Sequence, residues 1–346
     1  MKKVFTLLLI AAVFFPSCTA YVHFDAIQPA YVNIPVQYKK ILLINRTRPD
    51  AKRSIDKLEN VLTGEWGKQD SKASFRCLDG LSQNLQSSLK NYQTMVLKDT
   101  NLAGTGNMIF PPAMPPRFID SVCAKYGADI AIVLEAFDTD VISKANGAPV
   151  LLSPLPLLNP LAGPTFTLFS RVKAGFRIYD PKNNDMIDQF TLSTNYDFAL
   201  MNIPDQEVLL HLPHALQGVY ENGFMCGNDY GYRVAPHMAS RTRQIYRKGN
   251  YQMKMAYRSA VVGKWDDAYT IWQKNLTCGK RRAEWHSYYD LAVYYEKIGN
   301  LNLAIETAEK GFQLYGRQPL LYYSNILKDM KVEEKRVVEQ LPDTLK

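Results

Sequence analysis

Residues 128–141 read ADIAIVLEAFDTDV, and this run decides the fold of the N-terminal part of the chain. Apolar residues fill the positions from Ile130 to Phe137 with one break, at Glu135. An apolar run of this length is typical of a strand that is buried on both faces of a sheet. A similar run, Ile41–Ile44, lies upstream in KKILLINRT. Helices must then cover both faces of the sheet, which predicts an α/β fold.

The segments around these two strands supply the expected helices. Leucines at steps of three and four predict a helix between the strands, and YQTMVL (residues 92–97) predicts a further short strand. The leucines are Leu78, Leu81, Leu85 and Leu89. Ile119, Val122 and Cys123 predict another helix, which Gly127 would end in the C-cap position. A final helix is expected from about Gln206 to Tyr220, started or bent by Pro213.

Two alternating runs after the central strand predict a β-hairpin. Residues 166–178 place apolar side chains on one face and Arg171, Lys173 and Arg177 on the other, which we expect to be solvated. DPKNND (residues 180–185) supplies the turn, and MIDQFTLSTNY returns. The linking loop, residues 148–166, is rich in Pro and Leu. We expect it either to pack on the sheet or to form an exposed apolar ridge at Leu151–Leu161.

This order of elements resembles the α/β domain of periplasmic accessory lipoproteins and secretion proteins. That group includes the curli-secretion lipoprotein and the N-terminal domain of the Tol-system β-propeller protein. The segments that carry the resemblance are KKILLIN, YGADIAIVLEAF and FRIYDPKNNDMIDQ. The first strand is followed by NRTRPDA, without the glycine-rich turn that a dinucleotide-binding fold requires.

The N-terminus predicts export and a lipid anchor. Lys2 and Lys3 precede a 12-residue apolar run, Val4–Phe15, which is too short to cross a bilayer as a helix. Ser17 and Cys18 then resemble the lipobox of bacterial lipoproteins, in which the cysteine is acylated, for example with palmitate. The alternative is an ordinary signal peptide whose cysteine later forms a disulfide. In bacteria of the Bacteroidota type, lipoproteins that are exported to the cell surface tend to carry acidic residues just after the cysteine. Residues 19–24 contain none, which favours the periplasmic face of the outer membrane over the cell surface.

We therefore expect four segments along the chain. Residues 1–17 are a signal peptide, and residues 18–38 are an extended tether or an edge segment that follows the lipidated Cys18. Residues 39–228 form the α/β domain, and residues 229–342 form an all-helical domain. Four further cysteines, Cys77, Cys123, Cys226 and Cys278, are expected to be buried thiols, with one or two disulfides as the alternative.

The helical domain is predicted from an internal repeat. MAYRSAVVGKWDDAYTIWQ aligns with LAVYYEKIGNLNLAIETAE, so that three pairs of small residues each lie 36 residues apart. The pairs are Ala256 and Ala292, Gly263 and Gly299, and Ala268 and Ala304. This pattern resembles tetratricopeptide (TPR) repeats, which place small residues where two helices cross. Together with PVQYKKILLINR and VAPHMASRTRQIYRKGN, it resembles an uncharacterised lipoprotein family of Bacteroidota.

The TPR resemblance implies a peptide-binding groove on the first helix of each repeat. Its residues would be Met253, Tyr257, His286, Tyr289 and Glu296. From Arg241 to Arg282 there are eleven Lys or Arg against two Asp, which predicts either a solvated helix face or a site for an anionic lipid or envelope polymer. We expect no nucleic-acid partner in the periplasm.

Sequence motifs for chemistry are weak. His211 and His214 have HxxH spacing without a third ligand nearby, so we expect no metal. Asp138 and Asp140 follow the buried strand and are expected to be solvated. Cys226 has no adjacent basic residue to activate it. We therefore expect no catalytic residue and no cofactor.

The favoured function is an outer-membrane-anchored adaptor or scaffold for envelope assembly, cell-wall synthesis or secretion. A secretion-complex subunit and an unrecognised envelope hydrolase are the alternatives.

Overall fold

The computed structural model describes residues 19–48, 59–97, 102–146, 165–200 and 212–341. Two compact units result. The α/β unit comprises Ala30–His237 with the residues from Glu339 onward, and the helical unit comprises Met238–Val338 with the residues up to Pro29. The predicted fold class, an α/β domain followed by an all-helical region, is confirmed. No helix of the described chain is both long enough and apolar enough to cross a membrane.

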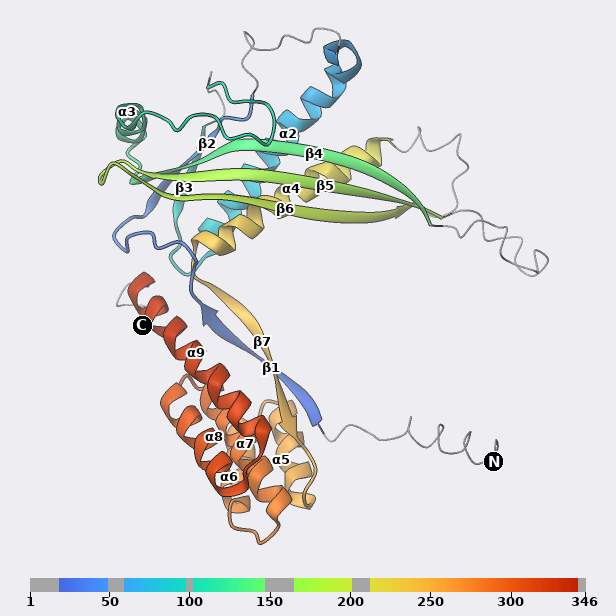
Figure 1. Cartoon of the computed structure of the whole chain (residues 1–346), viewed down its shortest axis with the longest axis vertical. Helices are drawn as coiled ribbons and strands as arrows, with labels where there is room; N and C mark the ends of the chain where they lie inside the picture. Colours follow the sequence, from blue (N-terminus) through green and yellow to red (C-terminus); the bar gives the residue numbers. More distant parts are fainter. Residues whose placement is uncertain (1–18, 49–58, 98–101, 147–164, 201–211, 342–346) are drawn as a thin grey trace, which may run out of the picture. The chain divides into compact units, whose positions relative to one another are not determined.

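A five-stranded mixed sheet forms the α/β unit, in the order β3-β2-β4-β5-β6 (Figure 1). The strands are β2 Lys40–Asn45, β3 Gln93–Leu97, β4 Ile130–Asn146, β5 Thr165–Asp180 and β6 Asp185–Leu200. Strand β2 is parallel to β3 and β4, whereas β5 and β6 continue the sheet antiparallel. In β2 and β4 the residues Ile41–Ile44 and Ile130–Ala136 are at most 1% exposed, as two covered faces require.

Helices pack on both faces of this sheet. The helices are α2 Glu59–Ser87, α3 Pro116–Tyr126 and α4 Leu212–Val234. Helices α2 and α4 cover one face and share its core with Leu43, Ile132 and Phe176. They cross closely, because a Cβ added at Gly227 would lie 1.7 Å from the Cys77 carbonyl oxygen. Helix α3 packs on the other face, over Leu42 and Val133. Gly127 ends α3 with a φ of 62°, as predicted.

The β5–β6 hairpin forms as predicted, with one difference. Asn184 adopts a φ of 57° in the turn, and the Asp180 carboxylate accepts hydrogen bonds from the backbone N–H groups of Lys182 and Asn183. Arg177, expected on a solvated face, is instead buried, because a buried glutamate of β4 lies within reach of its guanidinium. The alternation predicted the correct face, and the Pro111 carbonyl and the Phe110 ring cover that face at Arg177.

The last helix of the α/β unit extends beyond its predicted end. Helix α4 begins at Leu212, next to Pro213, and continues to Val234, so the predicted domain boundary after residue 228 falls inside it. The last turns of α4 contact α2 through Gly223, Gly227 and Gly231. Glycine does not contribute to an apolar helical pattern, so the sequence did not predict these turns. The predicted loop ridge at Leu151–Leu161 lies outside the described residues.

The helical unit contains five helices and a two-stranded sheet. The elements are β1 Thr19–Gln28, β7 His237–Tyr246, α5 Tyr251–Val261, α6 Trp265–Asn275, α7 Arg281–Lys297, α8 Leu301–Tyr315 and α9 Gln318–Gln340. Two helical hairpins, α5–α6 and α7–α8, repeat at the spacing predicted from sequence. The four repeat alanines are completely buried, and Gly263 and Gly299 adopt φ values of 82° and 78° just after α5 and α7.

The predicted tether forms regular structure in its first half. Residues 19–28 are strand β1, in which Val22 and Phe24 are buried among the aromatic residues of the helical core while Tyr21 and His23 are exposed. Residues 30–38 also pack, since Val32, Ile34 and Tyr38 belong to the core of the α/β unit. Residues 19–28 thus form a strand and not a free tether, and YVHFD has the period-two alternation of a strand with one covered face.

Candidate functional site

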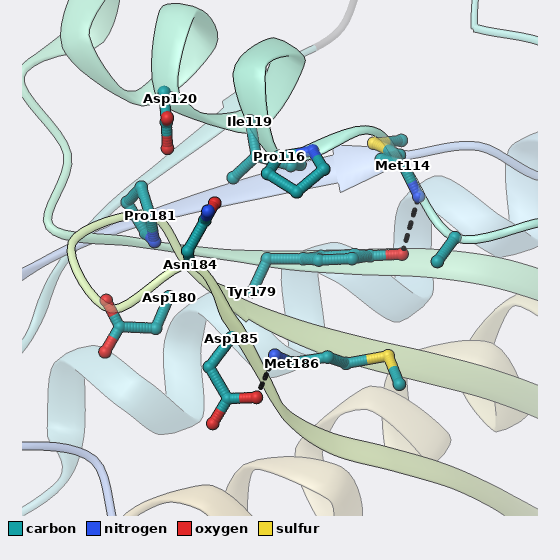
Figure 2. A pocket seen from close by; sticks show the side chains of 11 residues that line it. Met114, Pro116, Ile119, Asp120, Tyr179, Asp180, Pro181, Asn184, Asp185 and Met186 are labelled. Atoms are coloured by element: carbon teal, nitrogen blue, oxygen red, sulfur yellow. Dashed lines mark hydrogen bonds between the residues drawn. The ribbon is translucent and has the colours of Figure 1, made fainter.

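A pocket of about 190 Å³ lies between α3 and the turn that joins β5 to β6 (Figure 2). Its apolar wall comprises Ala113, Met114, Pro116, Ile119 and Met186. Tyr179 lies across its floor, and Asp120 and Asp185 stand at its sides. Both carboxylates are exposed, whereas Met114 and Ile119 are buried. The pocket therefore combines an apolar interior with negative charge at its opening.

Helix α3 and the hairpin turn hold the two sides of this pocket. Pro116 starts α3 and needs no N–H partner, which sets the direction of the helix and brings Ile119 against the sheet. On the opposite side, Asp180 does not offer a charge to the pocket. Its carboxylate accepts hydrogen bonds from the hydroxyl of Tyr38, at 3.0 and 3.1 Å, and from the hairpin turn. Asp180 thus shapes the turn, and Asp120 and Asp185 carry the available charge.

The floor of the pocket is tied to a buried ionic cluster. Glu135 of β4 is completely buried, and its Oε1 accepts a hydrogen bond from the Tyr179 hydroxyl at 2.8 Å. The same carboxylate pairs with Arg46 at 3.2 Å and Arg177 at 2.5 Å. Burial raises the pKa of Tyr179, which keeps its hydroxyl protonated and able to donate. We call these four residues the Glu135 cluster.

The Glu135 cluster fixes the segment that forms the pocket wall. Arg177 Nη1 donates to the carbonyl of Pro111 at 2.8 Å, and Arg46 Nη1 donates to the carbonyl of Pro112 at the same distance. The backbone N–H of Met114 donates to the Tyr179 hydroxyl at 3.2 Å (Figure 2). A proline-rich segment without regular structure is thereby held on the sheet by side chains, and the pocket is preformed.

The five residues of the predicted peptide groove lie mostly inside the helical unit. Met253 and His286 are 0% and 1% exposed, Tyr289 and Glu296 are buried, and only Tyr257 is half-buried. They form packing contacts, and in the described chain they do not line an open groove. The reason is that β1 and β7 contribute Phe24, Ile245 and Tyr246 to the same core. The sequence pattern could not show this, because it identified only the helices.

Contacts within the helical unit account for the burial of His286 and Tyr289. His286 Nδ1 lies 2.5 Å from the Lys248 carbonyl oxygen, and its ring stacks on Tyr246 with centroids 4.0 Å apart. Burial lowers the pKa of His286 to about 4. Tyr289 stacks on Tyr323 with centroids 4.8 Å apart.

Glu296 belongs to a second buried ionic cluster. Arg243 donates to both of its carboxylate oxygens at 2.7 Å, and Arg241 lies 3.4 Å away. The Tyr323 hydroxyl donates to the same carboxylate. We call these four residues the Glu296 cluster. Two arginines of the predicted basic segment, Arg241–Arg282, are thus engaged internally and do not contribute to a surface for an anionic ligand.

The structure does not arrange the other predicted sites for ligand binding in the part of the chain that it describes. His211 lies outside the described residues, and only the backbone of His214 is described, in α4. Asp138 and Asp140 face Lys173 and Arg171 across the β4–β5 ladder, so each carboxylate has an opposite charge beside it. Among the described residues, no group of three His, Cys, Asp or Glu side chains could hold a metal ion. The four described cysteines are thiols.

Sequence reasoning missed the Glu135 cluster and the pocket. One signal was available, because a lone Glu inside a fully buried strand requires a basic or hydrogen-bonding partner. That rule would have pointed to the neighbouring arginines of β2 and β5. The pocket itself had no signal, since it depends on where the proline-rich segment and the hairpin turn meet.

Comparison with protein-family models gives two matches. Residues 38–246 match the family described as Domain of unknown function (DUF8603), and residues 254–334 match Domain of unknown function (DUF6340). No curated protein matches the chain. The matched ranges follow the α/β unit and the repeat region. No TPR or curli-type family is among these matches.

Several solved structures of bacterial proteins align with part of the chain. A neuraminyllactose-binding hemagglutinin homolog from Helicobacter pylori has 14% identity and a TM-score of 0.26, over 60% of this chain and 96% of that chain. A minor lipoprotein from Acinetobacter baumannii has 10% identity and a TM-score of 0.25, over 57% and 93%. Lipoprotein GNA1162 from Neisseria meningitidis has 14% identity and a TM-score of 0.20, over 53% and 99%. At these TM-scores we draw no functional conclusion from them.

Proposed function

The chain belongs to the DUF8603 family, and from its own residues we propose that it is a lipid-anchored envelope protein that binds a protein partner. The observation that carries the binding role is the preformed pocket between α3 and the β5–β6 turn. The role is that of an adaptor at the periplasmic face of the outer membrane, where the chain would hold its partner near the membrane.

The anchor is supported by the N-terminal sequence. Val4–Phe15 supplies an export signal, and Ser17 and Cys18 match the lipobox positions. Several acyl chains on one cysteine would give a durable attachment, since each buried CH₂ contributes roughly 0.8 kcal/mol. Replacement of Cys18 by Ala should move the protein from the membrane fraction to the soluble periplasmic fraction. A variant that stays with the outer membrane would refute the anchor.

Binding is favoured over catalysis by the way the chain uses its acidic groups. Glu135, Asp180 and Glu296 are buried, and each accepts hydrogen bonds from arginine, tyrosine or turn residues that hold the structure together. A catalytic carboxylate needs to face a substrate. The two carboxylates of the pocket, Asp120 and Asp185, are exposed at its opening, where they suit recognition of a charge.

The pocket chemistry suggests a basic side chain of the partner. Lysine and arginine combine an apolar stem with a cationic end. Met114, Ile119 and Met186 would contact the stem, and Asp120 and Asp185 would contact the charge. A pocket of about 190 Å³ has room for one such side chain, so the remaining contacts with the partner would lie outside it.

Site-specific photo-crosslinking in cells tests this proposal. A photoreactive amino acid at Met186, on the pocket, is compared with one at Met95 in β3, because the two methionines are 41% and 48% exposed in the same unit. We expect one partner adduct at Met186 that is absent at Met95. Combining the probe with Asp120→Asn and Asp185→Asn should remove the adduct. An adduct that is unchanged in this variant, or equal at both methionines, would contradict the pocket as the binding site.

A further inference from the structure

Strand β6 is a long open edge of the sheet. In the part of the chain that the structure describes it pairs with β5 alone and lies at the margin of the sheet (Figure 1). Thirteen consecutive residue pairs, from Phe166 with Leu200 to Ile178 with Asp188, follow without a bulge. The opposite edge, β3, has only five residues. Strand β6 therefore offers a straight row of backbone groups that another strand can join.

Proteins normally protect such an edge, and β6 lacks the usual protection. Lysine, proline, a bulge or an inward-pointing charge prevents pairing with another chain. Between Asp185 and Leu200 there is no Lys, Arg, Pro or Gly. Asp188 points inward and pairs with Arg233 at 2.8 Å, which protects the first residues of the strand. From Gln189 to Tyr196 the strand carries no charge at all.

We propose that β6 pairs antiparallel with β6 of a second copy of this chain, about a twofold axis at Ser193. The occupant is a second copy because the strand is complementary to itself in this register. On the open face, Thr191 lies opposite Asn195 and Gln189 opposite Asp197, so both of these pairs can form hydrogen bonds. On the face covered by α4, Phe190 lies opposite Tyr196, which is a favourable cross-strand aromatic pair.

Charge disfavours one of the possible registers. Centring the pair on Thr191 would place Asp185 opposite Asp197, and like charges directly opposite are destabilising. Centring it on Ser193 places no two charged residues opposite each other. The two sheets would then form one continuous sheet of ten strands, five from each copy. This association does not depend on the lipid anchor.

Two matched lysine variants test the proposal in the full chain, purified in detergent and measured by light scattering. Ser193→Lys would place two lysines face to face at the axis. We expect the dissociation constant of the dimer to increase at least tenfold. Thr191→Lys adds the same residue to the same exposed face, yet it lies opposite Asn195 and not opposite a second lysine, so the dimer should persist. If Ser193→Lys keeps the dimer, the association arises elsewhere, for example from shared micelles. A monomeric wild-type protein would also overturn the proposal.

Disulfide trapping tests the register directly. Ser193→Cys should crosslink to itself under mild oxidation, because the two residues face each other. Gln189→Cys should not, because in this register the two cysteines are eight residues apart, about 27 Å along the strand. The unsubstituted chain controls for the native thiols, of which Cys278 is the most exposed. Equal crosslinking of both variants would exclude the Ser193-centred pair.

Discussion

The Glu135 cluster and the Glu296 cluster have the same composition in two different units. Each contains one buried glutamate, two arginines and one tyrosine hydroxyl. In the helical unit the partners come from β7, α7 and α9, which are regular elements with their own backbone hydrogen bonds. In the α/β unit the arginines also donate to carbonyl groups of a segment without regular structure.

This difference shows that one arrangement of side chains serves two tasks. The Glu296 cluster joins elements that already have hydrophobic contacts, because Tyr289 and Tyr323 pack beside it. The Glu135 cluster instead holds residues 111–114 on the sheet through side-chain hydrogen bonds, and so it builds the pocket wall. The arginines of the Glu135 cluster are also more buried. The side chains of Arg177 and Arg46 are 9% and 15% exposed, whereas those of Arg243 and Arg241 in the Glu296 cluster are 20% and 18% exposed.

The largest effect is expected for Glu135→Leu. This change leaves Arg177 and Arg46 without their carboxylate, and an unpaired buried charge costs about 3–5 kcal/mol of unfolding free energy. Urea denaturation followed by circular dichroism measures the loss. A decrease below about 1 kcal/mol would mean that water reaches the arginines, and the comparison between the two clusters would fail.

For Glu296→Leu we expect a smaller loss, near the lower end of that range at about 3 kcal/mol. The reason is that Arg241 and Arg243 are closer to solvent. Urea denaturation followed by tryptophan fluorescence measures this loss of unfolding free energy, since Trp265, Trp272 and Trp285 lie in the helical unit. If this variant proves less stable than Glu135→Leu, solvent exposure does not determine the contribution of the clusters.

A pH titration of stability should show the titration of His286. Its pKa is about 4 in the folded chain and about 6.5 when unfolded. Below pH 6.5 the unfolded chain binds a proton that the folded chain does not, so stability falls from pH 6.5 to pH 4. The loss is at most about 3 kcal/mol.

The His286→Phe variant is the control for this titration. Carboxylates titrate in the same range, so the difference between wild type and variant isolates the histidine. Identical pH profiles for the two proteins would show that His286 is hydrated in the folded chain.

The smallest effects are expected from the two hydroxyl deletions, Tyr179→Phe and Tyr323→Phe. Each removes a hydrogen bond to a charged group, worth about 1.5–3 kcal/mol, and the neighbouring arginines still satisfy the carboxylate, so we expect about 1.5 kcal/mol. Only Tyr179→Phe also releases Met114 from the pocket wall. It should weaken crosslinking from Met186, whereas Tyr323→Phe should leave it unchanged. Equal crosslinking yields would separate the Glu135 cluster from the pocket.

Much of the fold was predictable because it depends on local periodicity. The buried runs in β2 and β4, the alternation in β5 and β6, and the 36-residue repeat each reflect one element or one repeated pair of elements. The alanines of the repeat occupy the predicted positions because only small residues fit where the helices cross. Gly263 and Gly299 instead provide the positive φ that the chain adopts just after α5 and α7.

The candidate sites were less predictable because they depend on which elements meet. Glu296 was placed on a groove from a helical pattern alone, and the strand β7 that covers it lies outside that pattern. Arg177 was placed on a solvated face because its partner, Glu135, belongs to another strand. The pairing of β7 with the helical unit decides where Glu296 lies. The order of β4 and β5 and the course of residues 102–115 decide where Arg177 lies. Neither arrangement has a period that a sequence can show.

Strand β1 begins at Thr19, directly after the cysteine that the sequence marks for acylation. An extended tether over residues 18–38 would have spanned up to about 70 Å and let the protein sample a wide volume above the membrane. If Cys18 carries the proposed lipid, a chain ordered from residue 19 would leave almost no flexible linker between the lipid and the helical unit. The helical unit would then stay close to the bilayer surface, and distant partners would have to diffuse to it.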